Sequence, residues 1–216
     1  MSKGYFITLE GGEGAGKSTQ IKRLARALEN VGINTITTRE PGGAPGAEEI
    51  RNLLVNGETK RWAPMAEVLL HTAARAEHLD KTVIPALKNG SWVISDRFSD
   101  STLAYQGFGH GVDKAVIENI YRDAFSNFKP DLTLIIDISP DVGLARAGTR
   151  AAGGTNPNED RYERMGVSFH QRIRNGFLEI AKENPERCVV INGELDEDGV
   201  FSAIKDAVIK RFEIKI

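Results

Sequence analysis

Residues 11–18 read GGEGAGKS, which is the phosphate-binding pattern G-x-x-x-x-G-K-[ST]. The apolar, β-favouring run Tyr5–Leu9 precedes the pattern, and apolar residues recur at helical spacing from Ile21 to Leu28 after it. The sequence therefore predicts a strand, a glycine loop and a helix in succession. Successive N–H groups of such a loop form a concave anion site, and the N-terminal end of the helix adds positive charge.

Two side chains of this loop carry chemistry beyond backbone N–H groups. Lys17 is placed to reach the terminal phosphates of a nucleotide, and the Ser18 hydroxyl is placed to hold a magnesium ion. A glycine-rich turn that binds nothing is the alternative, and the flanking strand and helix argue against it.

Composition sets broad limits. The 216 residues fit one α/β domain, residues 1–216, and 40% apolar residues suffice for a substantial core. The formal net charge of −2 implies no general affinity for nucleic acid. The lone Cys188 excludes an internal disulfide and fits a reducing compartment, and no apolar stretch is long enough to cross a membrane. We expect a cytoplasmic protein with no membrane partner.

Strands alternate with helices along the chain, which predicts an α/β fold with a doubly wound, five-stranded parallel sheet and helices on both faces. A long helix is expected over Pro64–Lys88 and a shorter one near Ala47–Val55. The expected strands are Tyr5–Leu9, Asn34–Thr38, Trp92–Ser95, Leu132–Ile138 and Cys188–Ile191. Such sheets bind ligands at the carboxyl ends of their strands.

Asp96 and Arg97 follow the third expected strand directly. A carboxylate at a strand end beside a phosphate loop is suited to a magnesium ion, and a guanidinium there can grip a phosphate with two hydrogen bonds. A salt bridge involving Asp96 and Arg97 is the simpler alternative. The phosphate loop in the same chain favours the functional interpretation, with Asp96 and Ser18 at the metal.

An arginine-rich segment with a small, polar centre is expected to form a short mobile lid insert at about residues 147–162. Arginine suits charge neutralisation during phosphoryl transfer, and a lid excludes water. Arg150 is the first candidate for a catalytic role, and Arg146 is the second. Acidic residues are interleaved here, so an ordinary salt-bridged helix start is the alternative, and it is the preferred interpretation for Arg164, Arg172 and Arg174.

Two pairs of residues with i, i+4 spacing suggest a second ligand. His71 and Arg75 share one side of the long helix, and Thr102 and Gln106 share a side if residues 99–107 are helical. An arginine and a glutamine amide together satisfy a base edge that carries a carbonyl and an N–H group. An ordinary surface position is the alternative for each of these residues.

The sequence resembles the bacterial thymidylate kinases over nearly its whole length. The phosphate loop is common to many families, whereas Arg39-Glu40-Pro41-Gly42-Gly43 and Ala104-Tyr105-Gln106-Gly107 are more specific. The other matching blocks are 49–51, 73–75, 83–87, 95–97, 130–134, 142–144 and 160–163. The resemblance implies a nucleoside monophosphate kinase-like P-loop NTPase fold with strand order 2-3-1-4-5 and a homodimer. It also implies ATP-dependent, magnesium-dependent phosphorylation of dTMP to dTDP.

The resemblance also implies residue roles. Glu13 would bond the sugar 3′-hydroxyl, Arg51 and Arg97 would hold the dTMP phosphate, and Tyr105 would close on the deoxyribose. Arg75 would bond the thymine carbonyl, with Thr102 and Gln106 completing the base contacts. Members of the family without an arginine in the phosphate loop carry the catalytic arginine in the lid, which implies that role for Arg150 beside Lys17 and Arg97. The residues expected to bind ATP are Gly11, Gly12, Glu13, Gly14, Ala15, Gly16, Lys17, Ser18, Thr19 and Arg146.

One position departs from the family pattern. His71 stands where a phenylalanine normally stacks on thymine. A neutral imidazole still stacks but with less apolar area, and a charged one desolvates poorly. We therefore expect dTMP binding to weaken as the pH falls into the titration range of His71.

Two other functions are compatible with a phosphate loop. A deoxynucleoside kinase phosphorylates a sugar hydroxyl and needs a carboxylate base, but the arginines on the acceptor side favour an anionic acceptor. A nucleotide-dependent switch that reads guanine usually carries an Asn-Lys-x-Asp segment, and this sequence has none.

Overall fold

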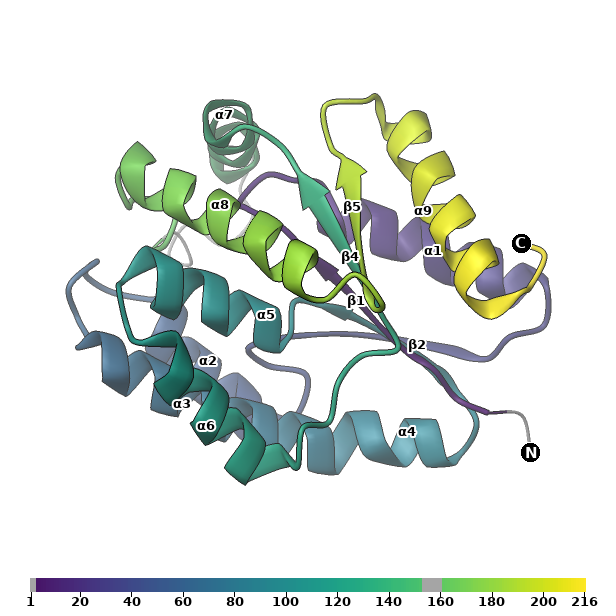
Figure 1. The fold of residues 1–216 in the computed structure, drawn as a ribbon, viewed down its shortest axis with the longest axis horizontal. Helices are drawn as coiled ribbons and strands as arrows, with labels where there is room; N and C mark the ends of the chain where they lie inside the picture. Colours follow the sequence, from purple (N-terminus) through teal and green to yellow (C-terminus); the bar gives the residue numbers. More distant parts are fainter. Residues whose placement is uncertain (1–2, 153–160) are drawn as a thin grey trace.

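The computed structural model describes residues 3–152 and 161–216, and these contain one five-stranded sheet with all neighbouring strands parallel. The strand order is β2-β3-β1-β4-β5, which confirms the predicted doubly wound fold (Figure 1). The strands are β1 (Phe6–Glu10), β2 (Thr35–Arg39), β3 (Trp92–Asp96), β4 (Leu132–Asp137) and β5 (Cys188–Asn192).

Helices cover both faces of this sheet. On one face, α1 (Lys17–Asn30) and α9 (Glu197–Phe212) pack side by side, and their apolar residues bury Ile7, Leu9 and Ile94. On the other face, Phe6 and Val93 pack against the end of the long helix, and Ile135 packs against α8 (Val167–Glu183). Figure 1 shows α1 and α9 on the opposite side of the strands from the cluster of α2, α3 and α6. Alternate residues of the central strands thus enter different cores, because successive side chains point to opposite faces.

The remaining helices lie mostly in the connections after β2, β3 and β4. The predicted long helix is continuous but mixed in type, because a π-helical segment separates two α-helical ones. Pro85 has no N–H for an i→i−4 bond, which fits this local change of hydrogen bonding. Besides α8, the helices in the connections after β2, β3 and β4 are α2 (Pro45–Val55), α3 (Pro64–His78), η1 (Leu79–Val83), α4 (Ile84–Lys88), α5 (Ser99–Thr102), η2 (Leu103–Gly109), α6 (Lys114–Phe125) and α7 (Pro140–Ala152).

Strand register brings distant residues to one edge of the sheet. Asp96 at the end of β3 lies opposite both Leu9 of β1 and Arg39 of β2. Glu10, the last residue of β1, lies opposite Ile135 of β4. The carboxyl ends of the parallel strands therefore open beside the phosphate loop, as expected for ligand sites in this class of fold.

The segment predicted to form a lid begins within a helix. Residues 147–152 continue α7, and the described chain resumes at Arg161 before α8. The sequence prediction considered a helix start here but gave no range for α8, although Phe169, Ile173 and Phe177 recur at helical spacing and are buried. Residues 153–160 of the expected lid lie outside the described part of the chain.

Among the helices of the described residues, none combines the length and apolar character needed to cross a bilayer.

Candidate functional site

The phosphate loop packs tightly against α7. A Cβ atom at Gly14 would lie 1.9 Å from the Gly143 carbonyl oxygen, and one at Gly143 would lie 2.3 Å from the Glu13 carbonyl oxygen. Gly14 also has a φ of +67°, a conformation that side chains other than glycine rarely adopt. Two glycines far apart in the sequence thus permit one close backbone contact, which holds the loop against the end of the sheet.

Lys17 turns back over the loop that precedes it. Its ammonium group donates to the Gly11 and Gly12 carbonyl oxygens at 3.2 and 3.0 Å. Burial and the nearby Arg97 charge lower the pKa of Lys17 to about 8, against the opposing effect of neighbouring carboxylates. The loop therefore concentrates positive charge where we expect phosphates to bind.

Ser18 and Asp96 are close together, as the sequence predicts. The Ser18 hydroxyl donates to a carboxylate oxygen of Asp96 at 2.9 Å. Hydroxyl and carboxylate oxygens suit magnesium, which usually takes one or two protein ligands together with phosphates and water. The described residues contain no group of three or more His, Cys, Asp or Glu side chains placed to hold a metal. The residues present therefore fit a magnesium ion shared with a nucleotide rather than a site enclosed by protein ligands.

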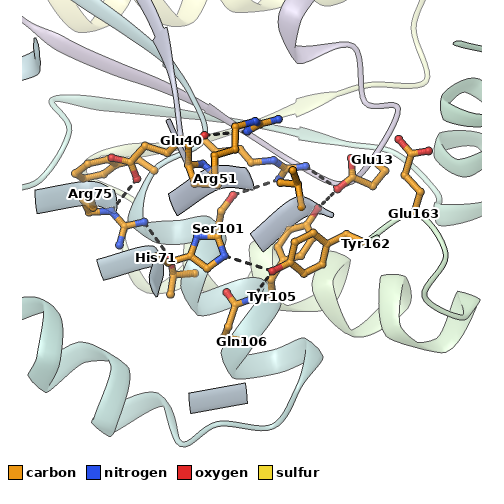
Figure 2. A pocket seen from close by; sticks show the side chains of 15 residues that line it. Glu13, Glu40, Arg51, His71, Arg75, Ser101, Tyr105, Gln106, Tyr162 and Glu163 are labelled. Carbon is orange, nitrogen blue, oxygen red and sulfur yellow. Dashed lines mark hydrogen bonds and ion pairs between the residues drawn. The ribbon is translucent and has the colours of Figure 1, made fainter. Parts of the chain in front are cut away.

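Arg97 lies where the phosphate loop meets a second cavity. Its φ of 71° is a left-handed conformation, which is uncommon for a residue other than glycine and is often found at functional sites. The guanidinium donates to the Gly11 carbonyl oxygen at 2.9 Å and to Glu13 at 3.0 Å. The Tyr105 hydroxyl donates to the same Glu13 oxygen at 2.7 Å (Figure 2). These contacts bring together three residues to which the family resemblance gives roles in binding dTMP.

Glu13 keeps its charge in these surroundings. Burial raises the pKa of its carboxyl, but the Arg97 and Lys17 charges and the Tyr105 hydrogen bond outweigh burial and hold the pKa at about 2. A carboxylate with this pKa is ionised throughout the physiological range, so it can accept hydrogen bonds from a hydroxyl group.

The second cavity holds the residues expected to read a base. Arg75 is buried, and its guanidinium donates to Glu40 at 2.8 Å and to the Thr102 hydroxyl at 2.9 Å. Thr102 and Gln106 lie on the predicted helical segment, which is α-helical in α5 and π-helical in η2. All four side chains line the cavity.

His71 lines the same cavity, with its Nε2 atom 3.4 Å from the Tyr162 hydroxyl (Figure 2). Burial and the charges of Arg75 and other arginines lower the pKa of His71 to about 3. The ring is therefore neutral near pH 7, and the expected effect of its protonation on dTMP binding is displaced to about pH 3.

The two cavities share four residues. Glu13, Glu40, Arg51 and Arg97 line both the cavity over the phosphate loop and the cavity that holds Arg75. Arg51 reaches this boundary from α2 and donates to the Pro41 carbonyl oxygen at 2.8 Å. Ligands in the two cavities would therefore meet between two guanidinium groups.

The arginines around the expected lid have different surroundings. Arg146 reaches the Gly193 carbonyl oxygen at 3.4 Å. Arg150 belongs to α7, but its side chain lies outside the described part of the structure. Arg174 pairs with Asp137 at 2.7 Å and Arg172 donates to the Gly109 carbonyl oxygen, which fits the structural interpretation of both.

Sequence reasoning assigned no role to several residues of this site. Glu40 belongs to a family-specific block, and the structure shows that it orients both Arg75 and His78. Glu67 is fully buried and accepts hydrogen bonds from Gln106, Tyr162 and Arg161. Glu67 lies on α3 four residues before His71, and this helical spacing is the sequence signal that could have indicated a role for it at the site.

A parallel sheet, a phosphate loop and an adjoining arginine-lined pocket define a P-loop kinase of the nucleoside monophosphate kinase class. The thymidylate kinase family model matches residues 9–204. The chain is 48% identical to a thymidylate kinase of Caulobacter vibrioides, covering 98% of this chain and 99% of the relative. It is 45% identical to one of Trichlorobacter lovleyi, covering 98% and 100%. The chain belongs to the thymidylate kinase family.

A solved structure agrees with this assignment. The crystal structure of thymidylate kinase from Ehrlichia chaffeensis has a TM-score of 0.74 and 35% sequence identity, and the match covers 94% of this chain and 98% of that one. The resemblance inferred from sequence motifs is confirmed, as are the fold class and the assignment as an ATP-dependent kinase.

The His71 pKa predicts a pH-dependent stability. The folded pKa of about 3 lies below the unfolded value of about 6.5, so below pH 6.5 the unfolded chain binds a proton that the folded chain does not. His71 therefore makes the free energy of unfolding fall as the pH drops, by about 1 kcal/mol per pH unit.

Urea unfolding at pH 7 and pH 5 of the parent and of His71→Phe measures this contribution. We expect the parent to lose about 1–2 kcal/mol more than the variant over this interval. Parallel losses in the two proteins would contradict the neutral state of the ring in the folded protein.

Proposed function

We propose that the protein transfers the γ-phosphate of ATP to dTMP, giving dTDP and ADP. The observation that carries this proposal is the junction of two cavities at Arg97 and Arg51. One cavity is the phosphate loop, and the other presents the Arg75 guanidinium and the Gln106 amide to a base. An anionic acceptor fits two guanidinium groups at the junction better than the neutral hydroxyl that a deoxynucleoside kinase phosphorylates.

The chain positions the two reactants and neutralises their charge. We place the β- and γ-phosphates of ATP on the loop at residues 11–18, with Lys17 at their oxygens. Arg97 and Arg51 hold the dTMP phosphate, which attacks the γ-phosphorus as the bond to the β-phosphate oxygen breaks. The attacking monoester is already anionic near neutral pH, so no general base is required. Glu13 accepts from the sugar 3′-hydroxyl, and Tyr105 packs beside the deoxyribose.

Magnesium is part of the proposal. Ser18 and Asp96 would hold the ion, and when bound it would neutralise charge on the β- and γ-phosphates. The adenine would lie between α7 and Asn192-Gly193, since Arg146 already contacts the Gly193 carbonyl oxygen there.

A panel of acceptors tests the function. ADP release is measured with dTMP, dUMP, dCMP, AMP and thymidine at equal concentrations, with and without magnesium. We expect the largest kcat/KM with dTMP and little activity with thymidine, because the nucleoside lacks the phosphate that Arg97 and Arg51 bind. Preferential phosphorylation of thymidine would favour the deoxynucleoside kinase.

Arg150 is proposed as the catalytic arginine of a lid at about residues 147–162. Arg150→Ala should lower kcat by about 10³–10⁵, because a guanidinium at the transferred phosphoryl group neutralises charge that develops in the transition state. The KM for dTMP should change little. The exposed Arg26 on α1 provides the control, and Arg26→Ala should leave both constants near the parent values. A rise in KM without a loss of kcat would contradict the catalytic role.

We also propose that the protein is a homodimer. Leu53 of α2 and Met65 and Leu69 of α3 are 39, 38 and 54% exposed on two helices that pack together, and such apolar surface favours association. Light scattering should give a dimer mass for the parent and a monomer mass for Leu69→Glu. Leu195→Glu, at a comparably exposed leucine elsewhere, should remain dimeric. An unchanged mass for Leu69→Glu would place the interface on another surface.

The cytoplasmic location and the absence of nucleic-acid partners remain predictions.

A further inference from the structure

A buried carboxylate lies directly behind the base-reading end of the second cavity. Glu67 is 0% exposed, and one of its oxygens accepts from the Gln106 side-chain nitrogen at 2.9 Å and from the Tyr162 hydroxyl at 3.0 Å. Its other oxygen accepts from the Arg161 guanidinium, whose side chain is also fully buried. The backbone carbonyl oxygens of Leu54, Glu58 and Thr59 accept the other hydrogen bonds of that guanidinium. The Glu67 charge is therefore neutralised within a well-anchored ion pair.

The carboxylate decides which way the Gln106 amide points. An ionised carboxylate only accepts hydrogen bonds, so the amide must present its nitrogen to Glu67. The nitrogen also lies 3.3 Å from the Tyr162 hydroxyl (Figure 2). The hydrogen of that hydroxyl goes to Glu67. Rotating the amide by half a turn would place its oxygen against a carboxylate oxygen and against the acceptor side of the hydroxyl. Both contacts are repulsive, so one orientation is fixed.

The fixed orientation leaves an acceptor for the ligand. Gln106 Oε1 is buried and has no hydrogen-bond partner among the described residues, and the side chain lines the cavity. An acceptor left without a partner in such surroundings costs free energy until a donor reaches it. The same network makes His71 Nε2 donate to the Tyr162 hydroxyl, because that hydroxyl has already used its hydrogen.

Arg75 supplies the complementary half of the recognition pattern. Its guanidinium carries only donors, donates to the Thr102 hydroxyl and lines the same cavity as Gln106. A donor next to an acceptor matches a base edge with a carbonyl at position 4 and an N–H at position 3, as in thymine or uracil. Cytosine presents the reverse pattern, an amino group beside an unprotonated ring nitrogen.

We propose that Glu67 is a positioning residue for base selectivity: it holds Gln106 Oε1 as an acceptor and so makes the site reject cytosine. Glu67 acts through Gln106 and touches no substrate. The inference rests on the proposed function, because it assumes that the second cavity binds a pyrimidine monophosphate.

The experiment compares kcat/KM for dTMP and dCMP in the parent, Glu67→Gln and Tyr162→Phe. The neutral amide of the first variant offers either a donor or an acceptor, so Gln106 becomes free to rotate. We expect the dTMP-to-dCMP ratio to fall at least about tenfold, while dTMP stays preferred because the Arg75 donors remain. Tyr162→Phe keeps the carboxylate, so its ratio should stay within about twofold of the parent.

A simple loss of structure would lower both activities and leave their ratio unchanged. An unchanged dTMP-to-dCMP ratio in a folded Glu67→Gln enzyme overturns the inference. A fall of this ratio in Tyr162→Phe equal to that in Glu67→Gln also overturns it, because the Tyr162 hydroxyl would then be the orienting group. A parent that shows no preference for dTMP over dCMP contradicts the proposed function itself.

The single variant leaves Arg161 buried without its carboxylate, which can prevent folding. The double variant Glu67→Gln/Arg161→Met removes both charges and retains much of the buried volume. We expect the same fall in the ratio there, and a parent-like ratio overturns the inference.

Discussion

The ion pair between Arg97 and Glu13 joins the two halves of the site, since both side chains line both cavities. The pair depends on the parallel sheet. Arg97 follows β3 and Glu13 follows β1, and these neighbouring strands end at the same edge. A left-handed backbone at Arg97 and the close Gly14–Gly143 contact then fix the two segments. Geometry set by the backbone thus places opposite charges where two anionic substrates would meet.

Charge is arranged differently in the deeper part of the second cavity. Glu40 and Glu67 are buried, and each accepts a hydrogen bond from a residue that lines this cavity: Glu40 accepts from Arg75, and Glu67 accepts from Gln106. Each carboxylate accepts several hydrogen bonds, which offsets the free energy of burying its charge. Under the proposed function, base recognition would therefore depend on buried carboxylates that do not themselves touch the ligand.

Local structure was predictable from the sequence where periodicity or a motif was strong. The phosphate loop, all five strands and the long helix were predictable, because each is encoded by neighbouring residues. The α8 helix carried a readable pattern at Phe169, Ile173 and Phe177, but the sequence prediction considered only a salt-bridged helix start in this region and gave it no range. His71 was identified as unusual, whereas the lowered pKa of its ring depends on burial and on arginines from several elements.

By itself, the sequence determined the phosphate loop, the α/β class and, through family motifs, many of the residues that line the two cavities. Only the tertiary structure decided how those side chains are oriented and charged. Glu67, Gln106 and Tyr162 are 39 to 95 positions apart, and a hydrogen bond between such residues follows from how helices pack. A motif records which groups are present, but directional hydrogen bonds and pKa values depend on distances and burial that exist only after folding.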